Sequence, residues 1–116
     1  MKEIIHETLN ELGVPFGTLG RDYLESAVEF VLERGRMAIT KELYPLIARA
    51  FGTTPTRVER AIRHSIEITF YNNQPNGIER FFGNTVSLKS GKLNNSDFIY
   101  GVVKHITVYK IKIQEE

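Results

Sequence analysis

The feature of this sequence that most restricts its fold is the segment Gly52-Thr53-Thr54-Pro55, which separates two amphipathic stretches. Glycine readily adopts the left-handed conformation in which many helices end. Thr54 is a good N-cap, and Pro55 then falls at the first helical position, where no helical hydrogen bond is lost through its missing N–H. The segment therefore predicts two helices joined by a tight turn, one ending near Phe51 and the next running from Pro55 to about Tyr71.

The second of these helices has an apolar side and a basic side at 100° per residue. The apolar side contains Val58, Ala61, Ile62, Ser65, Ile66 and Thr69, and the opposite side contains Thr56, Arg57, Glu59, Arg60, Arg63, His64 and Glu67. Arginine can grip a guanine edge or a phosphate through two N–H groups at once. Two helices joined by a tight turn, the second with a basic outward side, are typical of a DNA-binding helix-turn-helix.

The start of the same helix has a composition that suits phosphate. Thr53, Thr54 and Thr56 provide hydroxyls at a helix N-terminus, where free N–H groups and the helix dipole favour an anion. Glu59 would repel phosphate, but it can accept a hydrogen bond from a cytosine amino group or hold an arginine. A solvated helix face with i,i+4 ion pairs from Arg63 to Glu59 and Glu67 is the alternative. The residues alone leave both interpretations open.

The rest of the chain is predicted to be helical almost throughout. The first helix has Ile4, Ile5, Leu9 and Leu12 on one face and ends at Gly13-Val14-Pro15. A second helix is expected from about Arg21 to Arg34, stopped by Gly35. The helix before the turn is expected to be capped by Thr40, with a late start or a kink at Pro45.

The C-terminal third gives weaker signals. We expect a short helix at Ile78–Phe82, an irregular connection at 84–95, and a last helix capped by Asn95 or Ser96 that reaches about Ile106. The final residues, ITVYKIKIQEE, alternate apolar and polar side chains and are rich in β-branched residues, so they favour a strand. The chain as a whole is predicted to be all-α, a compact bundle of about six helices with an uncertain C-terminal tail.

Length and composition exclude several classes of protein. The 116 residues fit one domain, here 1–116, and the absence of cysteine excludes disulfides and thiolate metal sites. No apolar run is long enough to cross a bilayer, and the N-terminus lacks the pattern of a secretory signal, so a cytoplasmic location without membrane contact is expected. No phosphate-binding glycine loop or nucleophile–base set is present, and the Glu3-x-x-His6 spacing of di-iron bundles occurs once. We therefore expect no enzyme activity, no metal and no cofactor.

The segment ITKELYPLIARAFGTTPTRVERAIRHSIE, residues 39–67, resembles the DNA-binding effector domain of the stage zero sporulation protein A family, the master response regulators of endospore formation. ELGVP and YLESAV upstream, and FFGNTVSLKSGKLNNSDFI downstream, are similar to the same domain in order and spacing. The resemblance reaches to about Val103. In the family a phospho-acceptor receiver domain precedes the effector domain, and this sequence corresponds to the effector domain alone.

The resemblance implies a sequence-specific transcription regulator, activating or repressing, that binds a double-stranded operator. The recognition-helix contacts of the family correspond to Thr56, Arg57, Glu59, Arg60, Arg63 and His64. Lys89 and Lys92, in the expected connection, could also meet phosphate. The family's contact with the sigma factor of RNA polymerase corresponds to Gly77, Glu79, Phe82 and Val86. Phenylalanines and Val86 in that segment can equally be core residues, and we expect this for at least one phenylalanine.

Two further expectations concern partners. Family operators are often tandem, so two copies of the chain could pair on adjacent sites, and the tail beyond Thr107 is expected to pack on its own domain or on a second copy. The alternative function, from a different class, is a protein-interaction module on the same fold that binds a sigma factor or regulator without specific DNA binding. Regulation through DNA requires the arginine face to be open, whereas the interaction module requires that face to be covered or unused.

Overall fold

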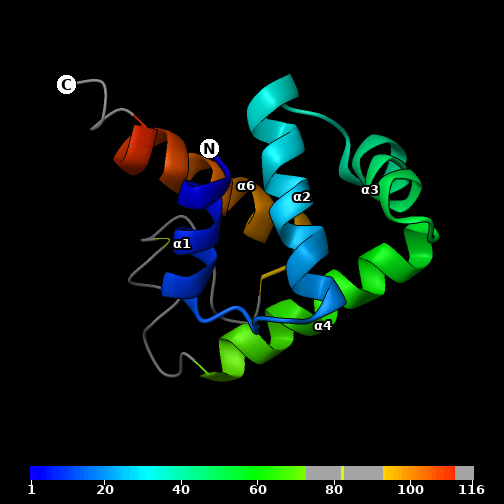
Figure 1. Cartoon of the computed structure of the whole chain (residues 1–116), viewed down its shortest axis with the longest axis horizontal. Coiled ribbons are helices and arrows are strands. Elements are labelled where there is room, and N and C mark those ends of the chain that lie inside the picture. The colour runs from blue at the N-terminus through cyan, green and yellow to red at the C-terminus, as the bar shows by residue number, and fades with distance from the viewer. Residues whose placement is uncertain (73–81, 83–92, 112–116) are drawn as a thin grey trace.

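The computed structural model describes residues 1–72, 82 and 93–111. Every element in these residues is a helix, as the sequence predicts for the chain before its tail. The elements are α1 (Lys2–Leu12), α2 (Leu19–Arg34), η1 (Ile39–Leu43), α3 (Tyr44–Phe51), α4 (Pro55–Asn72), α6 (Asn95–His105) and η4 (Ile106–Ile111) (Figure 1). Within the described ranges, no helix is both long and apolar enough to cross a membrane.

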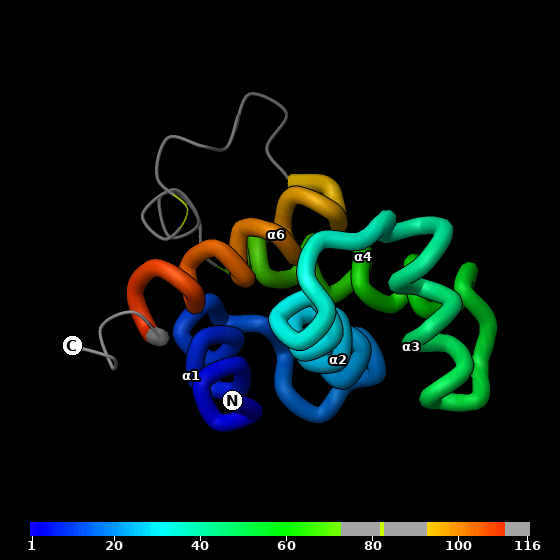
Figure 2. Tube along the Cα trace, turned by 90° about the horizontal axis from the view of Figure 1, so that it is seen from above, coloured from blue at the N-terminus to red at the C-terminus, as the bar shows by residue number. Residues whose placement is uncertain are grey.

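Helix α2 lies at the centre of the bundle. It contacts α1, α3, α4 and α6, and Figure 2 looks nearly along it, with these four helices around it. Its inward residues Leu24, Ala27 and Val28 are completely buried. They recur at the three- and four-residue spacing that places side chains on one helix face. The helix begins at Leu19 with Thr18 as its N-cap, two residues before the predicted start, and it ends at Gly35 as predicted.

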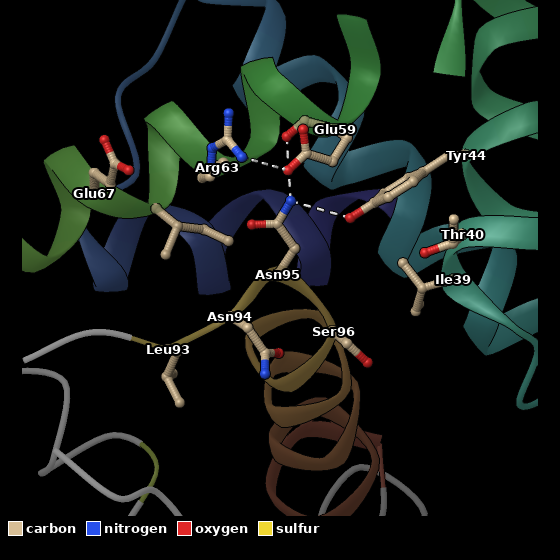
Figure 3. Close-up of a pocket in the computed structure, with 11 residues that line it drawn as sticks. Ile39, Thr40, Tyr44, Glu59, Arg63, Glu67, Leu93, Asn94, Asn95 and Ser96 are labelled. Carbon is tan, nitrogen blue, oxygen red and sulfur yellow. Dashed lines mark hydrogen bonds and ion pairs between the residues drawn. The ribbon is translucent and has the colours of Figure 1, made fainter. Parts of the chain in front are cut away.

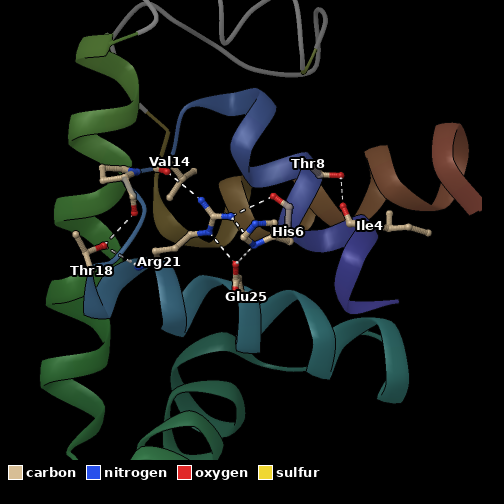
Figure 4. Close-up of polar contacts among 8 residues, drawn as sticks. Ile4, His6, Thr8, Val14, Thr18, Arg21 and Glu25 are labelled. Atoms are coloured by element: carbon tan, nitrogen blue, oxygen red, sulfur yellow. Dashed lines mark hydrogen bonds and ion pairs between the residues drawn. The ribbon is translucent and has the colours of Figure 1, made fainter.

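A buried arginine joins the first two helices. The Arg21 side chain is 1% exposed, and its Nε donates to Glu25 Oε1 at 2.9 Å (Figure 4). Its Nη1 donates to the Val14 carbonyl at 3.1 Å, and its Nη2 donates to the His6 carbonyl, also at 3.1 Å. The guanidinium therefore satisfies two backbone oxygens and one carboxylate between α1, the α1–α2 connection and α2. Sequence periodicity does not reveal such a residue.

Thr40 does not cap the helix before the turn, contrary to the prediction. Residues Ile39–Leu43 instead form one wide π-helical turn, in which the Leu43 N–H donates to the Ala38 carbonyl at 3.0 Å. Pro45 has no N–H and cannot continue an ordinary i→i−4 ladder, and the chain is wound more widely just before it. Of the two expected effects of Pro45, the structure shows the late start, because α3 begins at Tyr44.

The predicted cap of the last helix is wrong by one residue. Asn94 is the N-cap of α6, and its Oδ1 accepts from the Asp97 N–H at 2.8 Å. Asn95 lies at the first helical position, with its side chain directed toward α3 and α4 instead. Adjacent asparagines can both act as caps, so the local sequence does not show which of them has a partner elsewhere in the fold.

The predicted strand in the tail is also wrong for the part that the structure describes. Residues Ile106–Ile111 continue α6 as the π-helix η4, in which Ile106 is buried. A lone strand leaves its N–H and C=O groups unpaired, whereas a helix pairs them internally. Lys110 Nζ forms an ion pair with Glu11 Oε1 at 2.9 Å. This part of the tail therefore packs against α1 of its own domain, as the tail prediction allowed; residues 112–116 lie outside the described ranges.

We expect Gly20→Ala to loosen the contact of α2 with α4. A Cβ atom at this position would lie 2.4 Å from the Ala61 carbonyl oxygen and 2.0 Å from Ser65 Oγ, so the two helices must move apart. The free energy of unfolding, measured with urea, should fall by about 1–3 kcal/mol despite the better helix propensity of alanine. Adding Ser65→Ala should recover only part of this loss, since the Ala61 carbonyl remains. An unchanged unfolding free energy would show that α2 and α4 do not pack as closely at Gly20 as the structure indicates.

Candidate nucleic-acid interface

The turn between α3 and α4 has the geometry that the sequence predicts. Gly52 adopts φ 66° and ψ 41°, the left-handed conformation, and Thr53 N–H donates to the Ala48 carbonyl at 2.9 Å. Thr54 Oγ1 accepts from the Arg57 N–H at 3.2 Å, so Thr54 acts as the N-cap of α4. These bonds fix the direction in which α4 leaves the turn.

The two sides of α4 are divided as predicted. Its buried residues are Val58, Ile62, Ser65, Ile66, Thr69 and Phe70, and Ala61 is half-buried. The exposed candidate contacts are Thr54, Thr56, Arg57, Arg60, Arg63 and His64, and Thr53 and Glu59 are half-buried. The structure thus brings all eight of these predicted residues onto the start and outer side of one helix. Figure 1 shows α4 along the edge of the bundle, below α2 and α3.

The cations of this surface differ in their partners. Arg63 Nη1 lies 3.0 Å from Glu59 Oε1, one of the two expected i,i+4 pairs, and the Arg63 side chain remains 54% exposed. Arg57 and Arg60 have no ion pair with any carboxylate of the described residues. An arginine has five N–H donors, so the Glu59 pair can orient Arg63 and leave donors for a ligand. This surface can therefore bind phosphate or base edges through three arginines.

An asparagine behind α4 fixes this helix to two others. Asn95 Nδ2 donates to the Tyr44 hydroxyl at 3.0 Å and to the Glu59 carbonyl at 3.1 Å (Figure 3). Asn95, Tyr44 and Glu59 all line a pocket between α4, α3 and the start of α6. Burial raises the pKa of Tyr44 above its usual value, and the Asn95 hydrogen bond opposes that shift. Asn95 thus links the backbone of α4, at Glu59 between the arginines, to α3 and α6.

We expect Asn95→Ala to lower the free energy of unfolding by about 1–2 kcal/mol, because two hydrogen bonds to half-buried or buried groups are lost. The pKa of Tyr44 should rise further, since the donor that stabilises its phenolate is removed. Urea denaturation and tyrosinate absorbance at alkaline pH measure the two effects. Ser96→Ala, one position along the same helix, is the matched control and should change neither. Wild-type values for Asn95→Ala would show that the bonds do not hold α4.

The predicted sigma-factor residues are only partly described. Phe82 is 8% exposed, and its ring centroid lies 5.6 Å from that of Phe98 in an edge-on arrangement. This is the environment of a core side chain, as expected for at least one phenylalanine of the segment. Gly77, Glu79 and Val86, and the predicted phosphate contacts Lys89 and Lys92, lie outside the described residues. The described residues also contain no group of three His, Asp or Glu side chains that could hold a metal.

One comparison with known proteins bears on this interface. The family model described as sporulation initiation factor Spo0A, C terminal, matches residues 5–106. The matched range starts inside α1 and ends at the first residue of η4. It therefore includes the turn, the whole of α4 and every described residue of the arginine surface. We use this name for Thr53, Thr54, Thr56, Arg57, Glu59, Arg60, Arg63 and His64.

Proposed function

The chain belongs to the family of C-terminal domains of sporulation initiation factor Spo0A, which are DNA-binding effector domains of a sporulation regulator, and we propose that it binds operator DNA sequence-specifically. In this proposal the N-terminal half of α4 enters the major groove, as the second helix of a helix-turn-helix does. The domain then regulates transcription in the cytoplasm.

The observation that supports the proposal most strongly is the row of cations on α4. Arg57, Arg60 and Arg63 follow one another at three-residue spacing on the exposed side, while the opposite side of the helix is in the core. The major groove of B-DNA is wide enough to admit an α-helix. Arginine side chains on such a helix can read base edges through paired hydrogen bonds. The burial of the other side fixes which residues point outward.

The residues of the surface suit different parts of a duplex. Arg57 and Arg60, free of carboxylate partners among the described residues, are proposed to read bases. Glu59 holds Arg63 and can accept from a cytosine amino group. The threonines Thr53, Thr54 and Thr56 lie around the start of α4, where phosphate is favoured. Thr54 Oγ1 already accepts from the Arg57 N–H, so its hydroxyl hydrogen is the group left for phosphate. His64, Lys89 and Lys92 complete the proposed contacts.

Selection from a library of random DNA duplexes tests the proposal. The immobilised chain should enrich one short sequence over successive rounds, and Arg60→Ala should enrich sequences degenerate at one base pair of it. A library that stays random after selection would instead favour the interaction module, in which the same fold binds protein and no specific DNA.

The proposed partner for activation is the sigma factor of RNA polymerase, contacted through Gly77, Glu79 and Val86. We expect Glu79→Lys to reduce activated transcription in a purified system by at least tenfold, while affinity for the selected duplex stays within about threefold. Phe82→Ser, in contrast, should unfold the domain or weaken DNA binding, because Phe82 is buried against Phe98. Full activation by Glu79→Lys would remove this residue from the proposed contact.

Pairing of two copies on tandem sites stays a prediction.

A further inference from the structure

A second group of cations surrounds a pocket formed by the C-terminal end of α2 together with η1 and α3. Arg34, Arg36, Lys41 and Arg49 line it together with Glu42, and its apolar lining is Met37, Pro45 and Leu46. Four cations against one carboxylate are concentrated here in a chain whose formal net charge is +1. All four cations are exposed, and the three apolar residues are half-buried. The pocket thus combines a basic rim with an apolar floor.

Two of the four cations of this pocket are oriented by aromatic rings, and none of the four is paired with a carboxylate of the described residues. The guanidinium of Arg36 lies 4.4 Å from the ring centroid of Tyr100, and that of Arg34 lies 5.1 Å from the ring of Phe30. Stacking of this kind orients an arginine and leaves its N–H edge available. Among the described residues, none of the four cations forms an ion pair with a carboxylate. A carboxylate brought by a ligand would therefore find oriented donors.

The position of the pocket separates it from the arginine surface of α4. Helix α2 meets α4 at Gly20, near its start, whereas Arg34, Arg36 and Met37 lie at or just past its other end. The remaining lining residues lie on η1 and α3, the segment that leads into α4. Sixteen helical residues span about 24 Å. Figure 1 shows the C-terminal end of α2 at the edge of the bundle opposite to α4. A duplex held by the outer side of α4 is therefore not expected to reach the part of the pocket formed by Arg34, Arg36 and Met37.

We propose that the pocket formed by Arg34, Arg36, Met37, Lys41, Pro45 and Arg49 binds an acidic polypeptide segment of a partner protein that also inserts an apolar side chain. Charge complementarity identifies the acidic partner, since arginine pairs with carboxylates through two parallel hydrogen bonds. The apolar floor of Met37, Pro45 and Leu46 favours a peptide over a DNA backbone, which presents phosphate and sugar but no apolar side chain. Glu42 also opposes a uniformly anionic ligand.

A labelled peptide tests this proposal on the full chain. The probe is a fluorescein-labelled 12-residue peptide in which glutamate alternates with leucine, and its control replaces each glutamate with glutamine. Fluorescence anisotropy should show binding of the acidic peptide that weakens with added salt, and at least tenfold weaker binding of the control. Polyglutamate of the same length should also bind at least tenfold more weakly, because it has nothing to place on the apolar floor.

Matched variants assign the binding to the pocket. Lys41→Gln with Arg49→Gln should weaken the acidic peptide at least tenfold and leave the thermal midpoint and duplex affinity unchanged. Arg57→Gln with Arg60→Gln, the same charge change on α4, should have the reverse effect. The proposal is overturned if the wild-type chain does not bind the acidic peptide, or if the pocket variant binds it equally well. It is also overturned if the pocket variant loses duplex affinity as the α4 variant does, which would make the pocket a phosphate contact.

Discussion

Arg21→Ala is expected to lower the free energy of unfolding by about 3–5 kcal/mol, enough to unfold a marginally stable domain of this size. The substitution leaves the carbonyls of Val14 and His6 without the donors that lie 3.1 Å from each. It also empties the space of a side chain that is 1% exposed. Glu25 is a third exposed, so water screens its part of the ion pair, and we attribute most of the loss to the carbonyls and the cavity.

Urea denaturation followed by circular dichroism measures this effect. The matched control is Arg49→Ala, which removes the same side chain from an exposed position and should change the unfolding free energy by no more than about 0.5 kcal/mol. Arg21→Lys should be nearly as destabilising as Arg21→Ala, because a single ammonium cannot reach three acceptors in different directions. If Arg21→Ala lost less than about 1 kcal/mol, the guanidinium would not be what joins α1 to α2.

The double substitution of Arg57 and Arg60 by alanine is expected to reduce affinity for the selected operator by about 2–6 kcal/mol, at about 1–3 kcal/mol for each base contact. Both side chains are exposed on α4, and neither has a carboxylate partner among the described residues. Fold stability should therefore be little affected. Anisotropy titrations of the selected duplex, with circular dichroism as a check on folding, measure the change.

The double substitution of Arg34 and Arg49 by alanine is the control, since it removes two exposed cations that lie on α2 and α3 and not on α4. It should leave operator affinity within about threefold, because neither side chain lies on the helix proposed to enter the groove and salt screens the charges of exposed residues. Arg60→Ala alone should relax the preference at one base pair only. An equal loss of affinity on selected and random duplexes would instead show that the arginines bind phosphate and read no bases.

Local signals predicted the parts of the fold that depend on neighbouring residues. The turn at Gly52, the cap at Thr54 and the division of α4 into two sides follow from backbone preference, capping chemistry and the 3.6-residue period. These features alone place Arg57 and Arg60 on the outside. The exposed side of the candidate interface was therefore predictable from the sequence.

Features that depend on distant partners were not predictable in the same way. Asn95 does not cap α6 because Tyr44 and Glu59 accept from its side chain. Arg21 resembles any arginine at the start of a helix, yet its side chain is buried and donates to three acceptors from separate segments. The one usable signal at Asn95 was the asparagine pair itself, because a single cap requires only one of the two residues.

The tail shows the same limit. Alternation in ITVYKI favoured a strand, but a strand is stable only beside another strand, and each element of the described residues is a helix. The contact between Lys110 and Glu11 spans nearly the whole chain. A periodicity argument cannot include the position of Glu11, so it could not have indicated that this segment winds against α1.

The central claim is that the arginine side of α4 reads DNA sequence, and the most direct test is a titration of the chain with the selected duplex and with a scrambled duplex at 50 and 200 mM salt. We expect the selected duplex to bind at least about 100-fold more tightly at both salt concentrations. The logarithm of affinity for either duplex should fall with the logarithm of salt with a slope of about −2 to −3, as two or three neutralised phosphates require. Equal affinity for the two duplexes, or no binding to either, would contradict the claim.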